Sequence, residues 1–183
     1  MVAMQVCHFH GDEGVAGVPV GTEGALEFTC PRTQGHPRPG TYSWVSYPPP
    51  PDDKLGSGLM AELGLATELP AVLKGHVGRW VEYGVVEHDY AAANPEDFAR
   101  LVDRYGHTAV AAKKYTTSAF LALALGELSR RGTLLCRFGP ATGRWSYNSQ
   151  VSYWALPPEP TWDERLSWAD SGLDVNYVPG STE

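Results

Sequence analysis

The clearest pattern of apolar and polar positions lies between Lys113 and Leu156. Apolar residues recur at helical spacing between Thr117 and Arg131, after a capping Thr116 or Thr117 and before a stop at Gly132. The period then changes to two on both sides of a loop over 139–143, which predicts a twisted hairpin. A helix followed by a hairpin is the order of elements at the end of a winged helix.

Helical patterns also precede this stretch. Leu59 and Leu63 suggest a short helix, and apolar residues from Leu69 to Val81 predict a second, weakened by two glycines. The sequence Asn94-Pro95-Glu96-Asp97 is a strong helix start, and it predicts a helix over 95–105. Three helices before a hairpin favour a helix-turn-helix made by 95–105 and 117–131.

The connection between these two helices, from His107 to Tyr115, is longer than the usual turn of such a pair. The run from Ala109 to Ala112 within it is an alternative source of a short strand ahead of the second helix.

Two cysteines and two histidines near the N-terminus have metal-ligand spacing. Cys7 and His10 are separated by two residues, a 19-residue spacer follows, and Cys30 and His36 are separated by five. Two thiolates and two imidazoles are the ligand number of a closed tetrahedral zinc site, which predicts structural zinc in a small β module. His8 is an alternative to His10, and buried cysteines with surface histidines are the alternative without metal.

Length and composition limit the possible domain organisation and location of the protein. The 183 residues are 43% hydrophobic, enough for a small module and one domain. No apolar run reaches the roughly 18 residues of a membrane span, and no secretory signal is recognisable, so we expect a cytoplasmic protein without membrane contact. Three cysteines, two of them among histidines, favour metal binding over a disulfide framework.

These patterns predict an α+β protein with four segments. A zinc-ribbon-like Cys/His module spans 1–47, and a linker of consecutive prolines followed by glycines spans 48–58. A winged-helix domain with a three-helix core and a hairpin wing spans 59–156. An acidic tail with a short amphipathic helix spans 157–183, and we expect it to pack its tryptophan face on the domain or to cover a basic surface.

Charge is distributed unevenly along the chain. The formal charge is −7, yet residues 100–150 hold eight basic and two acidic residues, a local charge of +6 that leaves −13 elsewhere. Such asymmetry is typical of a phosphate-binding face.

Residues 59–156, with the hairpin sequence GPATGRWSYN, resemble a winged helix-turn-helix domain. The whole chain resembles small actinobacterial proteins that carry a zinc-ribbon-like start before such a domain. The resemblance implies binding of duplex DNA, with the helix over 117–131 in the major groove and the wing on the backbone or in the minor groove.

The positions of the 117–131 helix that we expect to be exposed have few side chains that read bases. We therefore expect the DNA contacts at the start of this helix and in the wing. Residues at the helix start would meet phosphate, and residues of the wing would complete the contact. The predicted DNA-binding residues are Lys113, Lys114, Tyr115, Thr116, Thr117, Ser118, Arg137, Arg144, Trp145 and Asn148.

Several functions remain open at this stage. The aromatic wing favours reading of a modified base such as 5-methylcytosine, through apolar contact and stacking. A protein-interaction or dimerisation module is the alternative to DNA binding, and homodimer formation is left open. No nucleophile elbow, phosphate loop or dinucleotide fingerprint occurs, so we expect a protein that is not an enzyme.

Overall fold

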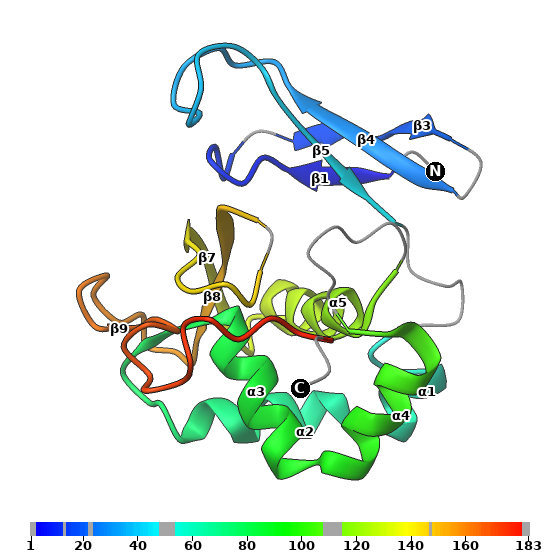
Figure 1. Ribbon diagram of the computed structural model, residues 1–183, viewed down its shortest axis with the longest axis vertical. Helices are drawn as coiled ribbons and strands as arrows, with labels where there is room; N and C mark the ends of the chain where they lie inside the picture. The colour runs from blue at the N-terminus through cyan, green and yellow to red at the C-terminus, as the bar shows by residue number, and fades with distance from the viewer. Residues whose placement is uncertain are drawn as a thin grey trace. The chain divides into compact units, whose positions relative to one another are not determined.

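A computed structural model describes residues 3–12, 14–21, 24–47, 54–107, 115–146 and 148–180. The chain divides into two compact units, Met1–Pro48 and Pro49–Glu183, and it contains both helices and sheets (Figure 1). Lys113, Lys114, the Ala109–Ala112 run and the prolines of the linker lie outside the described residues. Within the described part of the chain, no helix is both long and apolar enough to cross a membrane.

The N-terminal unit consists of two small antiparallel sheets. Strands β1 (Met4–Val6) and β2 (Gly14–Ala16) form one, and β3 (Val18–Val20), β4 (Ala25–Cys30) and β5 (Tyr42–Ser46) form the other, in the order β3-β4-β5. In the three-stranded sheet Phe28 lies opposite Trp44, and their rings stack with centroids 5.5 Å apart. The buried cluster is very small, because it contains only Cys7, Val15, Phe28 and Cys30 among the described residues.

The second unit contains all the helices of the described chain. They are α1 (Gly58–Glu62), α2 (Leu65–Lys74), α3 (Tyr83–Ala93), α4 (Pro95–Tyr105) and α5 (Thr117–Arg130). Local sequence explains the ends of the last two. Pro95 and two acidic residues open α4, and Gly106 ends it at a φ of 74°. The Thr116 side chain caps α5 by accepting a hydrogen bond from the Ala119 backbone nitrogen.

Four strands form the sheet of this unit in the order β7-β8-β6-β9. They are β6 (Trp80–Glu82), β7 (Leu135–Pro140), β8 (Gln150–Ala155) and β9 (Arg165–Leu166). Strand β6 pairs antiparallel with β8 and parallel with β9. The predicted hairpin therefore exists as β7 and β8, with a longer connection than expected. It is joined by β6, which lies between α2 and α3 in the sequence.

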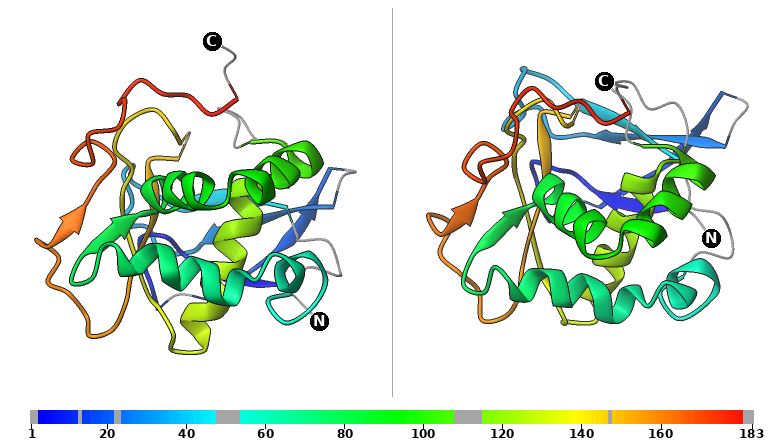
Figure 2. Two further views of the ribbon diagram at one scale, coloured as in Figure 1. Left: turned by 90° about the horizontal axis from the view of Figure 1, so that it is seen from below. Right: turned by 60° about the horizontal axis from the view of Figure 1, so that its bottom comes forward.

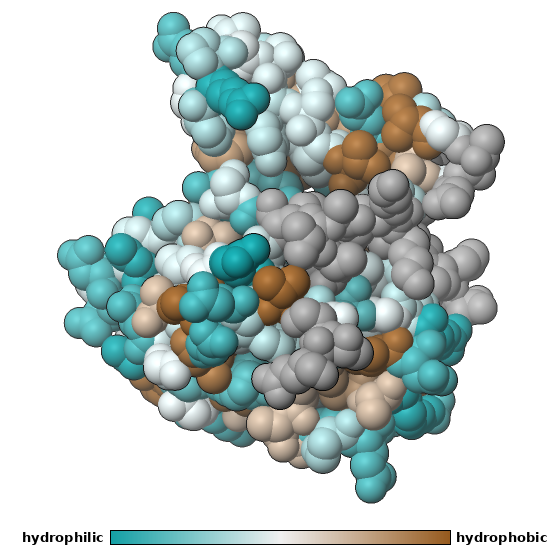
Figure 3. Space-filling model, viewed as in Figure 1, coloured by the Kyte–Doolittle hydropathy of each residue, from teal (hydrophilic) through white to brown (hydrophobic). Residues whose placement is uncertain are grey.

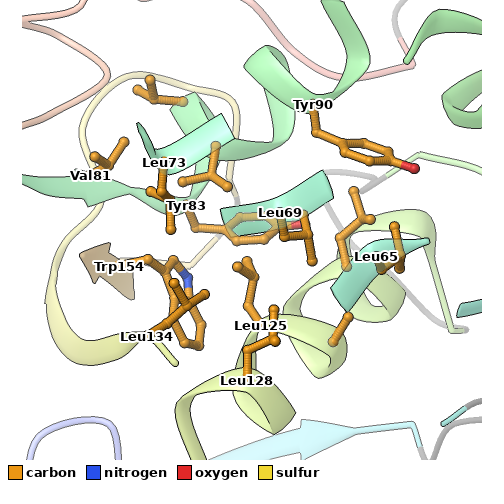
Figure 4. Packing of buried hydrophobic residues seen from close by; sticks show 14 of the residues in the cluster. Leu65, Leu69, Leu73, Val81, Tyr83, Tyr90, Leu125, Leu128, Leu134 and Trp154 are labelled. Carbon is orange, nitrogen blue, oxygen red and sulfur yellow. The ribbon is translucent and has the colours of Figure 1, made fainter. Parts of the chain in front are cut away.

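The core of the second unit lies where α2, α5 and the sheet meet. Figure 4 shows Leu65, Leu69 and Leu73 of α2 facing Leu125 and Leu128 of α5. All five side chains are at most 3% exposed. Burial of this apolar surface is the main favourable term in the folding of the unit, at about 25 cal/mol per Å².

Two expectations about this unit are wrong. The helix expected to continue to Val81 ends at Lys74, because Gly75 caps it and Gly78 has a φ of +81°, so Trp80 and Val81 start a strand instead. The C-terminal tail has no helix among its described residues. Its Leu166 belongs to β9, because the tail pairs with β6 and completes the sheet.

The two units also differ in surface character. Figure 3 shows apolar areas that interrupt a mostly hydrophilic surface. The large hydrophobic side chains exposed among the described residues are Met4, Val6, Val18, Val45, Val77, Val175 and Tyr177. Four of the seven belong to the N-terminal unit, which agrees with its small interior.

Candidate functional site

Four side chains of the N-terminal unit converge as a possible metal centre. Cys7 follows β1 and His10 follows the turn after it, whereas Cys30 ends β4 and His36 lies in the loop before β5. Their ligand atoms all lie within 4.8 Å of one another, close enough to bind a metal ion. Both cysteines are fully buried, and both histidines are partly buried.

The distances between these atoms agree with a tetrahedral ion. Cys7 Sγ lies 3.7 Å from His10 Nδ1 and 3.6 Å from His36 Nε2, and Cys30 Sγ lies 3.4 Å from His10 Nδ1. Sulfur at 2.3 Å and nitrogen at about 2.05 Å from a tetrahedral zinc ion are about 3.6 Å apart. These three sulfur–nitrogen distances therefore agree with a tetrahedral metal site of the size that zinc forms.

The second nitrogen of each histidine is also positioned by the fold. His36 Nδ1 lies 2.9 Å from the Gly40 carbonyl oxygen. Because that oxygen can only accept, Nδ1 carries the hydrogen and Nε2 keeps the lone pair that a metal needs. His10 Nε2 packs against Gly35, where an added β-carbon would lie only 2.7 Å away. Gly35 has a φ of +82°, so a glycine is needed there for both conformation and space.

Aromatic rings surround this group of four ligands. Phe9 packs edge to face with Tyr42 at 4.8 Å between centroids, and Tyr42 stacks on Trp44 at 5.6 Å. His8, the alternative ligand, packs on Trp44 at 5.1 Å and is not one of the four converging residues. Burial lowers the pKa of His8 to about 4, so its ring is neutral at physiological pH.

Several predicted DNA contacts do not face solvent. Thr116, Thr117 and Ser118 are 5%, 0% and 9% exposed, because the start of α5 is packed inside the unit. Tyr115 is partly buried and meets Tyr105 edge to face at 5.3 Å. Ser118, predicted as a DNA contact, is therefore buried at the start of α5.

Trp145, a predicted DNA contact of the wing, does not face solvent either. It is 5% exposed, and its indole lies over Gly84 of α3, where a β-carbon would come within 2.5 Å of the ring. By contrast, Arg137, Arg144 and Asn148 are exposed. The Arg137 guanidinium stacks over Trp162, 4.4 Å from the ring centroid.

Sequence reasoning missed a buried carboxylate in the second unit. Glu82, at the end of β6, is fully buried and accepts hydrogen bonds from Thr142 N at 2.9 Å, Trp145 Nε1 at 2.9 Å and Trp168 N at 2.7 Å. The Thr142 hydroxyl donates to it as well, at 2.6 Å. The sequence does contain an indication of this buried carboxylate. Glu82 lies in the otherwise apolar run WVEYGVV, and an acid in such a run is rarely buried without hydrogen-bond donors around it.

A second buried acid, Glu87, lies one helical turn from Tyr83 in α3. Its Oε2 lies 2.6 Å from the Tyr83 hydroxyl and 2.5 Å from Ser118 Oγ. Burial raises the pKa of Glu87 above its usual 4.5, although its two hydrogen bonds and nearby His107 act in the opposite direction. The Tyr83 hydroxyl also lies 2.8 Å from the Ser118 carbonyl oxygen.

One hydrogen on Tyr83 cannot serve both of these acceptors. If it goes to the Ser118 carbonyl, a protonated Glu87 can donate to the Tyr83 oxygen and accept from Ser118 Oγ. The hydrogen-bond geometry and the raised pKa of Glu87 therefore both favour its neutral form.

Comparison of the chain with known proteins identifies no relative. Models of protein families, curated proteins and solved structures were all compared with the chain, and none of them matches it.

Proposed function

We propose that the protein binds one zinc ion through Cys7, His10, Cys30 and His36, and that this ion holds the N-terminal unit together. The observation that carries the proposal is the convergence of these four ligand atoms within 4.8 Å. Two sulfur and two nitrogen donors are a common structural zinc set, and four protein ligands leave no position for a substrate. The ion would therefore stabilise the fold rather than take part in a reaction.

The small interior of the unit supports a structural role for the ion. Among the described residues of the unit, its cluster contains four buried hydrophobic side chains, and two of them are Cys7 and Cys30. A core of this size supplies little hydrophobic stabilisation, so small domains commonly depend on a metal or on disulfides. Cys7 and Cys30 form no disulfide.

Metal content of the purified full chain tests this proposal. We expect one equivalent of zinc, and Co²⁺ substitution should give the visible absorption of a tetrahedral site with thiolate ligands. Cys30→Ser should lose most of the bound metal, whereas Cys136→Ser, which changes an exposed cysteine of the other unit, should retain it. Equal metal content in the two variants would refute the assignment.

We propose DNA binding as a second function, through a winged helix in residues 59–156. The sheet order supports it, because β6 precedes α5 and pairs with the second hairpin strand, as the first strand of a winged helix does. Arg144 and Asn148 support it too, because both are exposed in the connection between β7 and β8. Trp145 gives no support to the modified-base version, because its ring is buried.

Fluorescence anisotropy with random duplexes, plain and cytosine-methylated, tests this second proposal. The slope of log affinity against log salt should become less steep by about 0.9 when one phosphate contact is removed, as in Arg144→Ala. Arg79→Ala is the matched control, because it removes an exposed arginine that precedes β6. Absence of binding at low salt would leave the protein-interaction module as the remaining hypothesis, to be tested by the oligomeric state.

A further inference from the structure

A cavity of about 70 Å³ lies in the second unit between α3 and the C-terminal segment. Figure 2 shows this segment (red) running beside α3 and α4 (green). Glu87 and Ala91 line the cavity from α3, Phe98 lines it from α4, and Tyr177 and Pro179 line it from the C-terminal segment. One water needs only about 15 Å³ of such space, so a group of several non-hydrogen atoms fits.

Four aromatic side chains line the cavity. Trp145 and Trp168 both line it, with centroids 6.1 Å apart, and Tyr177 stacks on Trp168 at 5.8 Å. Phe98 adds a fourth ring from α4. Aromatic faces carry partial negative charge, and they attract organic cations when water is excluded.

The acid in this wall is Glu87, which is 8% exposed. Both of its hydrogen bonds, with Tyr83 and Ser118, involve Oε2. Within the described part of the chain, no hydrogen bond reaches Oε1. A carboxyl oxygen that accepts no hydrogen bond from the protein has an unused capacity to accept one from a ligand.

We propose that this cavity binds the head group of a small organic ammonium ion, with Glu87 as its acceptor and Trp145, Trp168 and Phe98 as its aromatic walls. An apolar pocket with a single acid is suited to an alkylated amine, because the rings contact the alkyl groups while Oε1 faces the charge. The net charge of −7 favours a cationic ligand as well.

The groups around Glu87 determine how binding responds to pH. Tyr83 lies beside it on α3, Ser118 on α5, His107 after α4 and Tyr177 on the C-terminal segment. His88 also lines the cavity. Because a bound cation favours the carboxylate, binding should release a proton from Glu87, and affinity should rise as the pH rises through the pKa of Glu87.

Calorimetric titration of the zinc-loaded full chain in phosphate buffer tests the proposal. The probes are propylammonium, choline and 3,3-dimethylbutan-1-ol, which is the uncharged isostere of choline. We expect saturable binding of at least one cation at millimolar concentration or tighter, and at least about tenfold weaker binding of the uncharged isostere. Absence of cation binding, or equal binding of choline and its isostere, would overturn the proposal.

Two variants localise the binding. Glu87→Gln should weaken cation binding by about tenfold or more, because it removes the charge and keeps the size of the side chain. Tyr177→Ala removes a wall from a residue that is 43% exposed, and it should weaken binding several-fold without loss of the fold. Val175→Ala is the control in the same segment, since Val175 is also 43% exposed and does not line the cavity. Unchanged affinity in a folded Tyr177→Ala variant would exclude this cavity as the site.

Discussion

Trp145 donates its indole Nε1–H to Glu82 Oε1 over 2.9 Å, although 63 residues separate them in the sequence. Neither side chain is more than 5% exposed. The same carboxylate accepts hydrogen bonds from the backbone nitrogens of Thr142 and Trp168. Glu82 therefore joins β6 to the β7–β8 connection and to the C-terminal segment, and it positions a wall of the aromatic cavity.

Glu82→Gln should destabilise the second unit strongly. An amide presents its own hydrogens to donors such as Trp145 Nε1, so at least one buried donor loses its acceptor. A buried donor left without an acceptor costs about 1 to 3 kcal/mol, and urea denaturation followed by tryptophan fluorescence would measure this loss in the free energy of unfolding. Glu159→Gln, at an exposed position, is the control and should change the free energy of unfolding by less than about 0.5 kcal/mol.

The local sequence predicted helices whose first residues are typical of a helix start. The helix over 95–105 was expected from Asn94, Pro95 and two acids, and α4 spans Pro95–Tyr105. Helix α3 was missed because its apolar and polar residues do not follow a helical period: six of its eleven residues are buried, on more than one face. The helix predicted in the tail was wrong because the spaced hydrophobic residues of the tail lie in turns and in the short strand β9. That strand forms by pairing with β6, which is distant in the sequence.

The four candidate metal ligands were predictable because ligand chemistry depends on residue type and spacing. Cys7, His10, Cys30 and His36 were expected from the sequence, and they converge in the structure. Ser118 and Trp145 were two of the ten predicted DNA contacts, and a contact requires exposure, which tertiary packing decides. Both are buried because Glu87 and Glu82, distant in the sequence, offer them acceptors.

Gly84→Ala should destabilise the protein, and Gly126→Ala should not. A β-carbon on Gly84 would lie 2.5 Å from the Trp145 ring, which is buried and cannot move away easily. Overpacking of this kind costs about 1 to 3 kcal/mol. Gly126 lies in α5, and its nearest neighbour would be the flexible Arg130 side chain at 3.5 Å. Its replacement should raise the free energy of unfolding by about 0.5 to 1 kcal/mol, because alanine favours a helix.

Thermal unfolding of both glycine variants measures these differences. Gly84→Ala should lower the melting temperature and Gly126→Ala should leave it equal or higher. An equal decrease in the two would show that Trp145 does not pack tightly on α3.

Gly35→Ala should weaken metal binding through His10. The new methyl group would lie 2.7 Å from His10 Nε2 and push the imidazole from its position among the ligands. Gly21→Ala is the matched control, because Gly21 also has a positive φ of 68° but has no atom within 4 Å of an added β-carbon. Both variants carry a backbone strain of about 1 to 2 kcal/mol.

Competition with a chromophoric chelator separates the two effects. Gly35→Ala should release zinc to the chelator at a concentration at least about tenfold lower than Gly21→Ala does, since a displaced ligand weakens the site directly. Similar release from the two variants would mean that backbone strain alone accounts for the change.

Glu87→Gln should make the protein more stable at neutral pH. Burial holds the pKa of Glu87 above its usual 4.5, so between the unfolded and the folded pKa the folded state keeps a proton that the unfolded chain has released. The stability from this proton is fully present below the unfolded pKa and is lost as the pH rises through the folded pKa. Glutamine resembles the protonated acid and can maintain contacts with Tyr83 and Ser118 without this loss.

The free energy of unfolding of both proteins should therefore be measured between pH 4 and 8. Near pH 4 the two should be similar, and above the unfolded pKa the advantage of the variant should grow by at most about 1.4 kcal/mol per pH unit for one proton. His107 and Tyr177 are present in both proteins, so the difference between the two curves isolates residue 87. A variant that is less stable at pH 7 would mean that Glu87 is ionised in the folded protein and that its charge is held by Tyr83 and Ser118.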